Sequence, residues 1–292
     1  MAKVVILSNT DGYYSLVKKS LNRLKEENII KNECAAYLVT DGCLWDSYWQ
    51  QLLEGSEVVL IEWMGVTLET PYLQGALAYL QNKGIAFKIH AGGEAEGNAS
   101  NAFEAADHVL AAKYGVYGGI ENFKNLWLWL LCRFCKEELE YKQPQQMLWN
   151  GIYHPEADKI YTSLEEYQEN FCNPDYPTIG LIFYRNEWLL DNLAYQKALI
   201  EECSKQKVNI IAVFSHGVKN PEMGAPGLDE AVNKYFIKDG KTVIDCLINT
   251  IKFSLTASGS MELTVLKNLN VPFLQAYTLM RSTEEWQDNI QG

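Results

Sequence analysis

The chain has 292 residues, the length of about two domains, and 48% of them are hydrophobic, so it can bury substantial cores. Its formal net charge is −12, and lysine and arginine form no long basic run, which argues against nucleic acid or an anionic membrane as a partner. The apolar stretches are far shorter than the ~20 residues of a bilayer span, and the amino terminus lacks a signal-peptide layout. We therefore expect a cytoplasmic protein whose seven cysteines are free thiols.

The first part of the chain, residues 1–140, alternates β-branched runs with segments of helical period. The predicted strands are 3–8, 35–40, 58–64 and 85–90, and the predicted helices between them are 13–27, 43–53 and 72–82. Continuous apolar strands are typical of a sheet covered on both faces, and helical crossovers connect parallel strands. The pattern predicts a doubly wound α/β domain that ends in a long apolar helix over 123–134.

Three loops of this domain carry polar groups. The loop Ser8–Ser15 resembles a hydroxyl-rich phosphate loop before a helix, but its aspartate disfavours an anion, and the alternative is a capped helix start. The loop His90–Glu96 offers possible metal ligands or is a glycine turn. The paired glycines of Tyr114–Asn122 form an anion nest or allow close backbone packing. Cys132 and Cys135 share a helix face without further ligands nearby, so we expect them to pack.

Residues 141–177 contain four of the eight prolines, which predicts a domain boundary. Their aromatic and aliphatic side chains would be costly to leave in water, so this segment should pack as a neck rather than remain disordered. Within it, Pro155 disfavours the helical region for the preceding residue, so His154 is expected in an extended loop. His154 is then a candidate functional group or a structural histidine.

The last part, residues 178–292, repeats the α/β alternation. The predicted strands are 179–184, 208–214, 243–248 and 273–276, and the predicted helices are 189–205, 229–236 and 261–269. Ser282 and Glu285 have the spacing of a capping box, but the helix that they would begin has only a few residues, so we expect a truncated chain. The predicted fold is therefore two doubly wound, flavodoxin- or Rossmann-like parallel-sheet domains joined by a Pro-rich neck.

Polar side chains follow the predicted strands of the second domain. Because ligands bind at the carboxyl ends of parallel strands, we expect five of them to converge on one rim: Arg185, His216, Lys219, Asn249 and Gln275. Arg185 and Lys219 could hold carboxylates by charge-assisted hydrogen bonds, or could pair with the abundant acidic residues of the chain. We further expect His154 to face the same cleft as Arg185, Lys219 and Asn249.

Several motifs in the second half resemble the amino-terminal region of the CobN and magnesium-chelatase H-subunit family. They are YGVYGGIENFKNL (114–126), GIYHP (151–155), PTIGLIFYRNEWLLDN (177–192), IIAVFSHGVKNP (210–221), VIDCLINTIKFSL (243–255) and VPFLQAY (271–277), followed by Trp286. Their common order makes the resemblance specific, although Ser215–Val218 matches loosely. Members of this family are several times longer than this chain.

The resemblance implies a subunit that binds a tetrapyrrole into which cobalt or magnesium is inserted as substrate, with ATP and Mg on partner AAA+ subunits. In agreement, the chain has no G-x-x-x-x-G-K-[ST] loop, and we expect it to bind no cofactor and to be inactive alone. Insertion requires removal of two pyrrole protons, and tetrapyrrole carboxylates need polar and cationic contacts. We therefore expect His154 to be a base or metal relay, and the substrate-binding side chains to be Tyr153, Tyr184, Arg185, Lys219, Asn249 and Gln275.

Two other functions remain open. The Ser8–Ser15 loop would suit a flavodoxin-like protein that binds FMN or a nucleotide. The division into two domains would suit a small-molecule binding protein with a hinge at the neck. Neither the metal nor the tetrapyrrole can be chosen from the sequence, because no recognisable metal cage is present.

Overall fold

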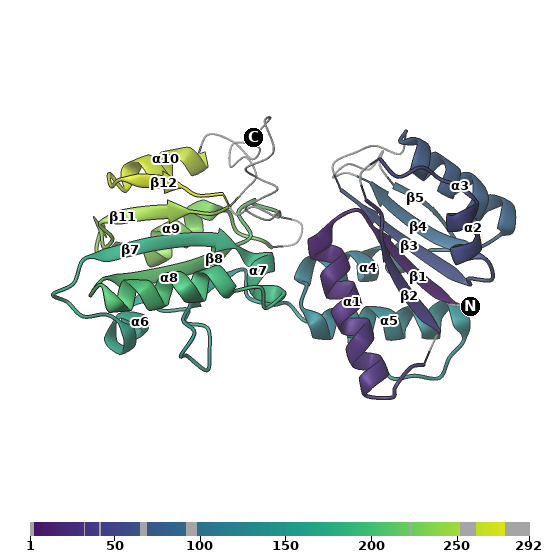
Figure 1. Ribbon diagram of the computed structural model, residues 1–292, viewed down its shortest axis with the longest axis horizontal. Coiled ribbons are helices and arrows are strands. Elements are labelled where there is room, and N and C mark those ends of the chain that lie inside the picture. The colour runs from purple at the N-terminus through teal and green to yellow at the C-terminus, as the bar shows by residue number, and fades with distance from the viewer. Residues whose placement is uncertain are drawn as a thin grey trace. The chain divides into compact units, whose positions relative to one another are not determined.

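The computed structural model describes residues 3–31, 33–40, 42–64, 69–91, 98–221, 224–251 and 261–277. The chain divides into a first unit, Met1–Met147, and a second unit, Leu148–Gly292 (Figure 1). Each unit contains one five-stranded sheet. No helix of the described ranges is long and apolar enough to cross a bilayer.

The sheet of the first unit has the strand order β2-β1-β3-β4-β5. Its strands are β1 (Val4–Ser8), β2 (Cys34–Leu38), β3 (Val58–Trp63), β4 (Ala86–Ala91) and β5 (Asn98–Asn101). The first four strands are parallel, and β5 pairs antiparallel with β4 at the edge. All five residues of β1 are buried, as expected for a central strand with helices on both faces.

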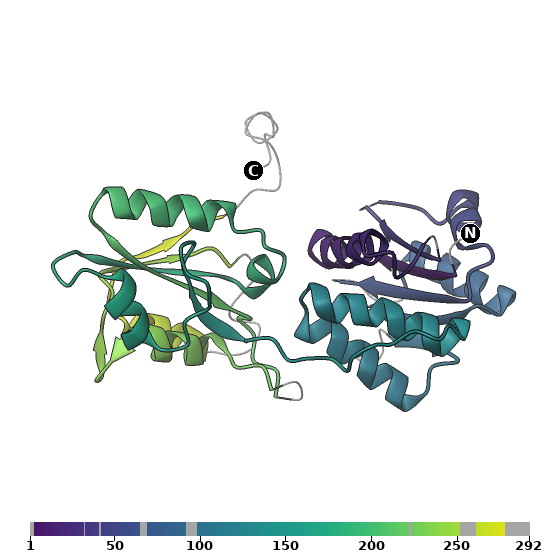
Figure 2. The same ribbon diagram turned by 90° about the horizontal axis from the view of Figure 1, so that it is seen from below.

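Helices cover both faces of this sheet (Figure 2). They are α1 (Asp11–Glu26), α2 (Ser47–Leu53), α3 (Pro71–Lys83), α4 (Ala105–Tyr117) and α5 (Ile120–Cys135). α2 and α3 pack on one face through residues such as Leu53 and Tyr72, and α1 packs against α5 on the other. The indole of Trp127 in α5 is fully buried and donates a hydrogen bond to the Val17 carbonyl of α1, 3.2 Å away. Burial of Trp127 explains why the 123–134 segment is apolar on most of its surface.

The second sheet has the order β12-β11-β7-β8-β6. Its strands are β6 (Asn150–Tyr153), β7 (Thr178–Tyr184), β8 (Asn209–Ser215), β11 (Cys246–Asn249) and β12 (Phe273–Gln275), and a small hairpin joins β9 (Ile237–Lys238) to β10 (Lys241–Thr242). β12, β11, β7 and β8 are parallel, whereas β6 pairs antiparallel with β8. The direction of β6 decides which residues reach each edge of this sheet.

Helices also lie on both faces of the second sheet (Figure 2). They are α6 (Leu164–Phe171), α7 (Arg185–Leu189), α8 (Ala194–Lys205), α9 (Leu228–Tyr235) and α10 (Met261–Asn268). α8 packs on the face that presents Phe183 and Phe214, while α6, α9 and α10 cover the face of Ile182 and Val213. The alternation of adjacent strand residues between two cores is the burial expected of doubly wound sheets.

The predicted fold class, mixed α/β with two mainly parallel sheets, is confirmed. Sequence patterns did not indicate β5, α4, β6, α6 or the β9–β10 hairpin, which are short or of mixed polarity. The segment predicted as a neck over 141–177 is divided between the units at Met147. Its first residues pack on the first unit, where Asn122 bonds to both the amide and the carbonyl of Gln145, and its remainder forms β6 and α6.

Parts of four predicted features lie outside the described residues. They are the glycine-containing part of the His90–Glu96 loop, the end of the VIDCLINTIKFSL motif, the capping box at Ser282 and Glu285, and Trp286. The Tyr114–Asn122 loop is described, and its first residues belong to α4. Gly118 and Gly119 have φ of 68° and 84°, so they provide the left-handed backbone that separates α4 from α5.

Candidate functional site

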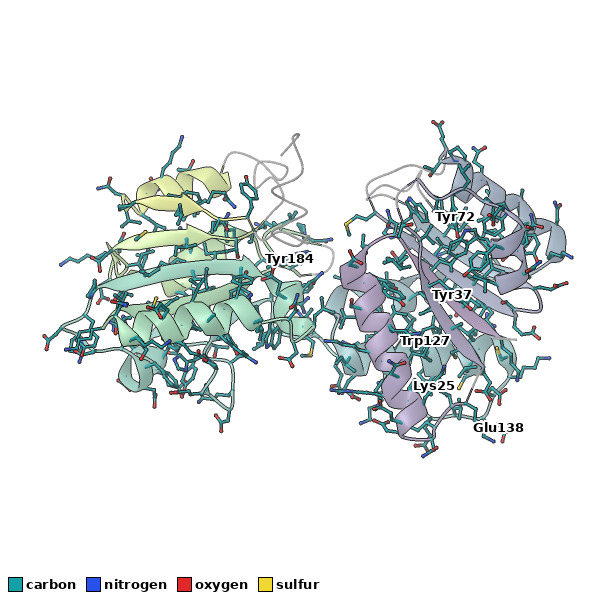
Figure 3. All side chains as sticks on the ribbon, viewed as in Figure 1. Lys25, Tyr37, Tyr72, Trp127, Glu138 and Tyr184 are labelled. Atoms are coloured by element: carbon teal, nitrogen blue, oxygen red, sulfur yellow. The ribbon has the colours of Figure 1, made fainter. Side chains whose placement is uncertain are left out.

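The carboxyl ends of β7 and β11 form the topological switch point of the second sheet. The chain leaves β7 toward β8 on one side of the sheet and later returns to β11 on the other side. Ligands of open α/β sheets bind at such a point because loops diverge there and leave a crevice. Figure 3 labels Tyr184 at the end of β7, and Asn249 ends the neighbouring β11.

Arg185 directly follows β7 and is the most deeply buried charged side chain among the described residues, at 1% exposure. Its Nε donates a 2.7 Å hydrogen bond to the carbonyl of Leu148, and its guanidinium lies 4.4 Å from the ring centroid of Trp149. Burial lowers the pKa of Arg185 to about 10, so the group remains charged at neutral pH. Arg185 therefore joins the start of β6 to the end of β7.

His216 follows β8 and lies between two aromatic rings. Its imidazole stacks on Tyr184 with centroids 6.3 Å apart and meets the edge of Trp149 at 5.5 Å. Burial, and secondarily the charge of Arg185, lowers the pKa of His216, so the ring is neutral at pH 7. Nδ1 of His216 is buried and has no hydrogen-bond partner within the described parts of the chain.

Asn249 and Gln275 form a hydrogen-bonded pair at the ends of β11 and β12. Nδ2 of Asn249 donates to Oε1 of Gln275 at 2.7 Å, and Nε2 of Gln275 donates to the carbonyl of Ile251 at 3.2 Å. Asn249 is 1% exposed, whereas Gln275 is partly exposed. The pair fixes the backbone after β11 and leaves Gln275 as its more accessible member.

A second hydrogen-bonded group includes Thr250, the residue that follows Asn249. The hydroxyl of Tyr195 in α8 donates to a Glu187 carboxylate oxygen at 2.7 Å and is also 2.7 Å from the Thr250 hydroxyl. Gln196 donates to the same oxygen of Glu187 at 2.7 Å. These bonds tie α7 and α8 to the end of β11, so they position the rim of the switch point.

Lys219 is exposed in the loop after β8 and makes no ion pair in the described ranges. It lines a groove of about 380 Å³ together with Trp149 and residues of α9. The carboxyl ends of adjoining strands thus carry Tyr184, Arg185, His216, Asn249 and Gln275, whereas Lys219 lies four residues beyond β8, in the groove that Trp149 also lines. Arg185 and Asn249 contribute from buried positions, which the sequence did not indicate.

His154 lies at the opposite edge of the sheet. Because β6 is antiparallel to β8, Asn150 pairs with Ser215 at the carboxyl end, and Tyr153 pairs with Ala212 farther back. His154, the next residue, is therefore separated from the switch point, and the expected common cleft with Arg185, Lys219 and Asn249 does not include it. The antiparallel direction of this short strand is the physical reason.

The surroundings of Tyr153 and His154 differ from those of the carboxyl edge. Tyr153 is buried with its ring 6.4 Å from Phe183 in the core beneath α8. The His154 imidazole stacks on Phe171 with centroids 3.9 Å apart, and its Nδ1 accepts a 3.3 Å bond from the Glu156 amide. Burial lowers the pKa of His154, and the ring lines a groove of about 740 Å³.

At the switch point of the first sheet, polar side chains hydrogen-bond to other groups of the same unit. The Ser8 hydroxyl accepts a hydrogen bond from the Thr10 amide at 3.1 Å, and the Asn9 carboxamide makes two hydrogen bonds with the backbone of Met64. Glu62 and His90 form a 2.8 Å pair on neighbouring strands. An acidic group at this position disfavours a phosphate ligand.

The cysteines form no metal centre in the described structure. All seven are free thiols, and Sγ of Cys132 donates to the Leu139 carbonyl at 3.1 Å. Among the residues that the structure places, no three histidine, cysteine or acidic side chains gather as a metal site.

Trp149 is the main site residue that sequence reasoning missed. It contacts both Arg185 and His216, yet its position in the proline-rich segment suggested only a packing role. Its distance in sequence from the strand ends of the second sheet hid the contact, because antiparallel pairing of β6 cannot be inferred from a run of four residues, Asn150–Tyr153, that contains glycine.

Comparisons with known proteins agree on one family. The model of the CobN/magnesium chelatase family matches residues 112–292, which include the whole second unit. An uncharacterized protein of Methanocaldococcus jannaschii is 38% identical over 189 residues, covering 62% of this chain and 15% of that protein. The chloroplastic magnesium-chelatase subunit ChlH of Oryza sativa is 21% identical over 211 residues, covering 65% of this chain and 15% of the subunit.

A solved structure shows the same fold. The catalytic subunit of cobaltochelatase from Mycobacterium tuberculosis aligns with 98% of this chain and 22% of its own, with a TM-score of 0.56 and 18% identity. The chain therefore spans less than a quarter of these similar proteins.

Proposed function

The chain belongs to the CobN/magnesium chelatase family, and we propose that it corresponds to the amino-terminal, tetrapyrrole-binding region of a large subunit that inserts cobalt or magnesium into a corrin or porphyrin ring. The observation that carries this proposal is the placement of Tyr184, His216 and Gln275 at the carboxyl ends of adjoining strands, with Lys219 in the neighbouring groove beside Trp149, all within the matched residues. Aromatic rings suit the face of a flat macrocycle, and a lysine and an amide suit its carboxylates.

Arg185 and Asn249 would support the tetrapyrrole-binding surface without touching the ring. Because both are almost fully buried, they hold Trp149 and Gln275 in place rather than reach into solvent. Direct contacts with the ring would come from the accessible groups, above all Tyr184, Lys219 and Gln275. Tyr153 would support this surface from the core beneath α8.

His154 is proposed as a base or metal relay at the amino edge of the sheet. A neutral imidazole can accept a pyrrole proton or bind a metal ion, and the lowered pKa of His154 keeps it neutral. Because it is separated from Tyr184, His154 would act on the metal ion or on a ring held in its own groove, and not as the base for a ring held at the carboxyl edge.

The remaining steps would belong to other parts of the assembly. We propose AAA+ subunits as the partners that hydrolyse ATP, because metal insertion by the family would need an energy source and this sequence contains no phosphate-binding Walker loop. The chain alone would bind the tetrapyrrole without inserting metal.

Titration of the chain with coproporphyrin tests this function. We expect saturable quenching of tryptophan fluorescence, with Tyr184→Ala weakening the affinity about five- to tenfold through loss of one aromatic contact. Tyr141→Ala, at a 38% exposed tyrosine of the first unit, is the matched control and should leave affinity unchanged. Absence of saturable binding to the unchanged chain would contradict the proposal.

A flavin-binding function is the second candidate, because the order β2-β1-β3-β4 of the first sheet is that of flavodoxin-like folds. The acidic Asp11 and Glu62 near the β1 and β3 ends weigh against it, since FMN would place a phosphate there. Flavin absorbance that remains with the purified chain through gel filtration would favour this alternative.

A further inference from the structure

A groove of about 380 Å³ adjoins the carboxyl edge within the second unit. Four segments form it: the start of β6, Thr162 before α6, the loop after β8, and α9. The lining residues that bear on its chemistry are Leu148, Trp149, Lys219, Pro226, Glu230 and Lys234. Small-molecule pockets typically measure ~300–1,000 Å³, so this groove suits part of a large ligand rather than all of it.

Part of the groove lining is apolar. Leu148 is 42% exposed there, and Trp149 and Pro226 continue the apolar lining. The Trp149 ring is held by the buried Arg185, whose guanidinium lies 4.4 Å from its centroid. The Arg185 charge also makes the potential near this ring more positive.

Two lysines also line the groove, and the Lys234 ammonium lies 5.0 Å from the ring centroid of Tyr235. Lys219 and Lys234 are exposed, and neither forms an ion pair in the described ranges, although the chain has 37 acidic and 25 basic residues. Lysines elsewhere do pair, as Lys124 with Glu27 at 2.7 Å. Glu230 is the single carboxylate among the described lining residues, so these carry a net positive charge.

A groove lined by two lysines and by apolar side chains suits a carboxylate on an apolar arm. The arm gains burial against Leu148 and Pro226, while the carboxylate accepts charge-assisted hydrogen bonds from the lysines. We propose that this groove is the subsite for a carboxylate side chain of the tetrapyrrole, with Lys234 as a second cation besides Lys219. This inference rests on the proposed function and locates the ring carboxylate in the second unit.

Two probes and two variants test the subsite. The probes are coproporphyrin, which carries four propionates, and its tetra-amide, which has the same ring without the charges. The test variant is Lys219→Gln/Lys234→Gln, and the control is Lys197→Gln/Lys241→Gln, which removes two exposed lysines outside the groove. Affinities are measured by fluorescence titration at fixed ionic strength, because surface charge pairs are screened by salt.

We expect the test variant to bind coproporphyrin about five- to tenfold more weakly and the tetra-amide within twofold of the unchanged chain. The control variant should bind both probes as the unchanged chain does. Equal losses for both probes, equal losses in both variants, or no loss for coproporphyrin would each overturn the subsite while leaving tetrapyrrole binding intact. Failure of the unchanged chain to bind either probe would instead overturn the proposed function and the subsite with it.

Inorganic phosphate distinguishes a carboxylate site from a general anion site. Succinate should displace coproporphyrin from the unchanged chain at lower concentration than phosphate does, and the test variant should lose this difference. Equal displacement by the two anions would overturn the assignment to carboxylates.

Discussion

Gly151 is the residue of the GIYHP motif whose replacement the structure constrains most clearly. It lies in β6 with ordinary, non-left-handed backbone, so alanine could adopt its conformation. An alanine Cβ would, however, lie 2.3 Å from Cγ2 of Ile160 and 3.2 Å from two ring atoms of Phe214. The close approach of the Ile160 side chain, and of Phe214 on the paired strand, rather than backbone freedom, therefore requires glycine.

The loss of unfolding free energy on this substitution depends on how far each of the two neighbours can move. Ile160 must shift by about an ångström out of its packing against this core, and Phe214, which stacks on Trp188 with centroids 4.3 Å apart, has little room to adjust. Overpacking of this kind typically costs ~1–3 kcal/mol. Loss of glycine entropy in the unfolded chain offsets ~0.4–1 kcal/mol of this. We expect Gly151→Ala to lower the unfolding free energy of the second unit by about 1–2 kcal/mol.

Hydrogen–deuterium exchange measures this change within one unit. Peptides from β7 and β8 should exchange about 5- to 30-fold faster in the variant, and peptides from the first unit should be unchanged. Ile160→Ala removes the clashing methyl group, so the same glycine substitution should cost less in that background. An unchanged exchange rate in β8, or an equal cost in both backgrounds, would refute the steric explanation.

Three further predictions concern single side chains. Asn209→Leu should destabilise the second unit by about 2–4 kcal/mol in urea unfolding, because the buried carboxamide makes four hydrogen bonds to residues 173–178. Tyr72→Phe should raise stability by about 1 kcal/mol in the same assay, because the buried hydroxyl has no hydrogen-bond partner in the described structure. Burial and Arg185 hold the pKa of His216 below its unfolded value, so acidification from pH 7 toward 5 favours the unfolded chain, and His216→Gln should make this loss of stability shallower.

The parallel strands were predictable because burial on both faces leaves a continuous apolar run. The five buried residues of β1 are an example, and the corresponding runs gave the strands β3, β7 and β8. β5 has the sequence NASN and could not be recognised in this way. It is held at the edge of the sheet partly by Asn101, whose carboxamide hydrogen-bonds to the backbone of Ile85 and Phe87. Such side-chain pairing has no periodic pattern.

The positions of the candidate site residues at strand ends could be predicted from the sequence, because the strands themselves could. Carboxyl ends of parallel strands share an edge, so Arg185, Asn249 and Gln275 were expected together and lie on adjoining strands. The burial of Arg185 and Asn249 could not be inferred, because it depends on segments from distant sequence positions, such as Trp149 against Arg185. The same strand β6 brings Trp149 to this edge and takes His154 away from it.

The distance along β6 between Trp149 and His154 leads to a prediction about the role of His154. Trp149 and His154 are five residues apart along an extended segment, which corresponds to roughly 17 Å, whereas a general base must lie within ~2.6–3.2 Å of the proton that it removes. A ring bound against Tyr184 and Trp149 therefore cannot use His154 as its base in the same position. His154→Gln should leave coproporphyrin affinity within twofold of the unchanged chain, while Tyr184→Ala lowers it. If His154→Gln weakens binding as much as Tyr184→Ala does, the ring contacts the amino edge of the sheet, and assignment of the site to the carboxyl edge is wrong.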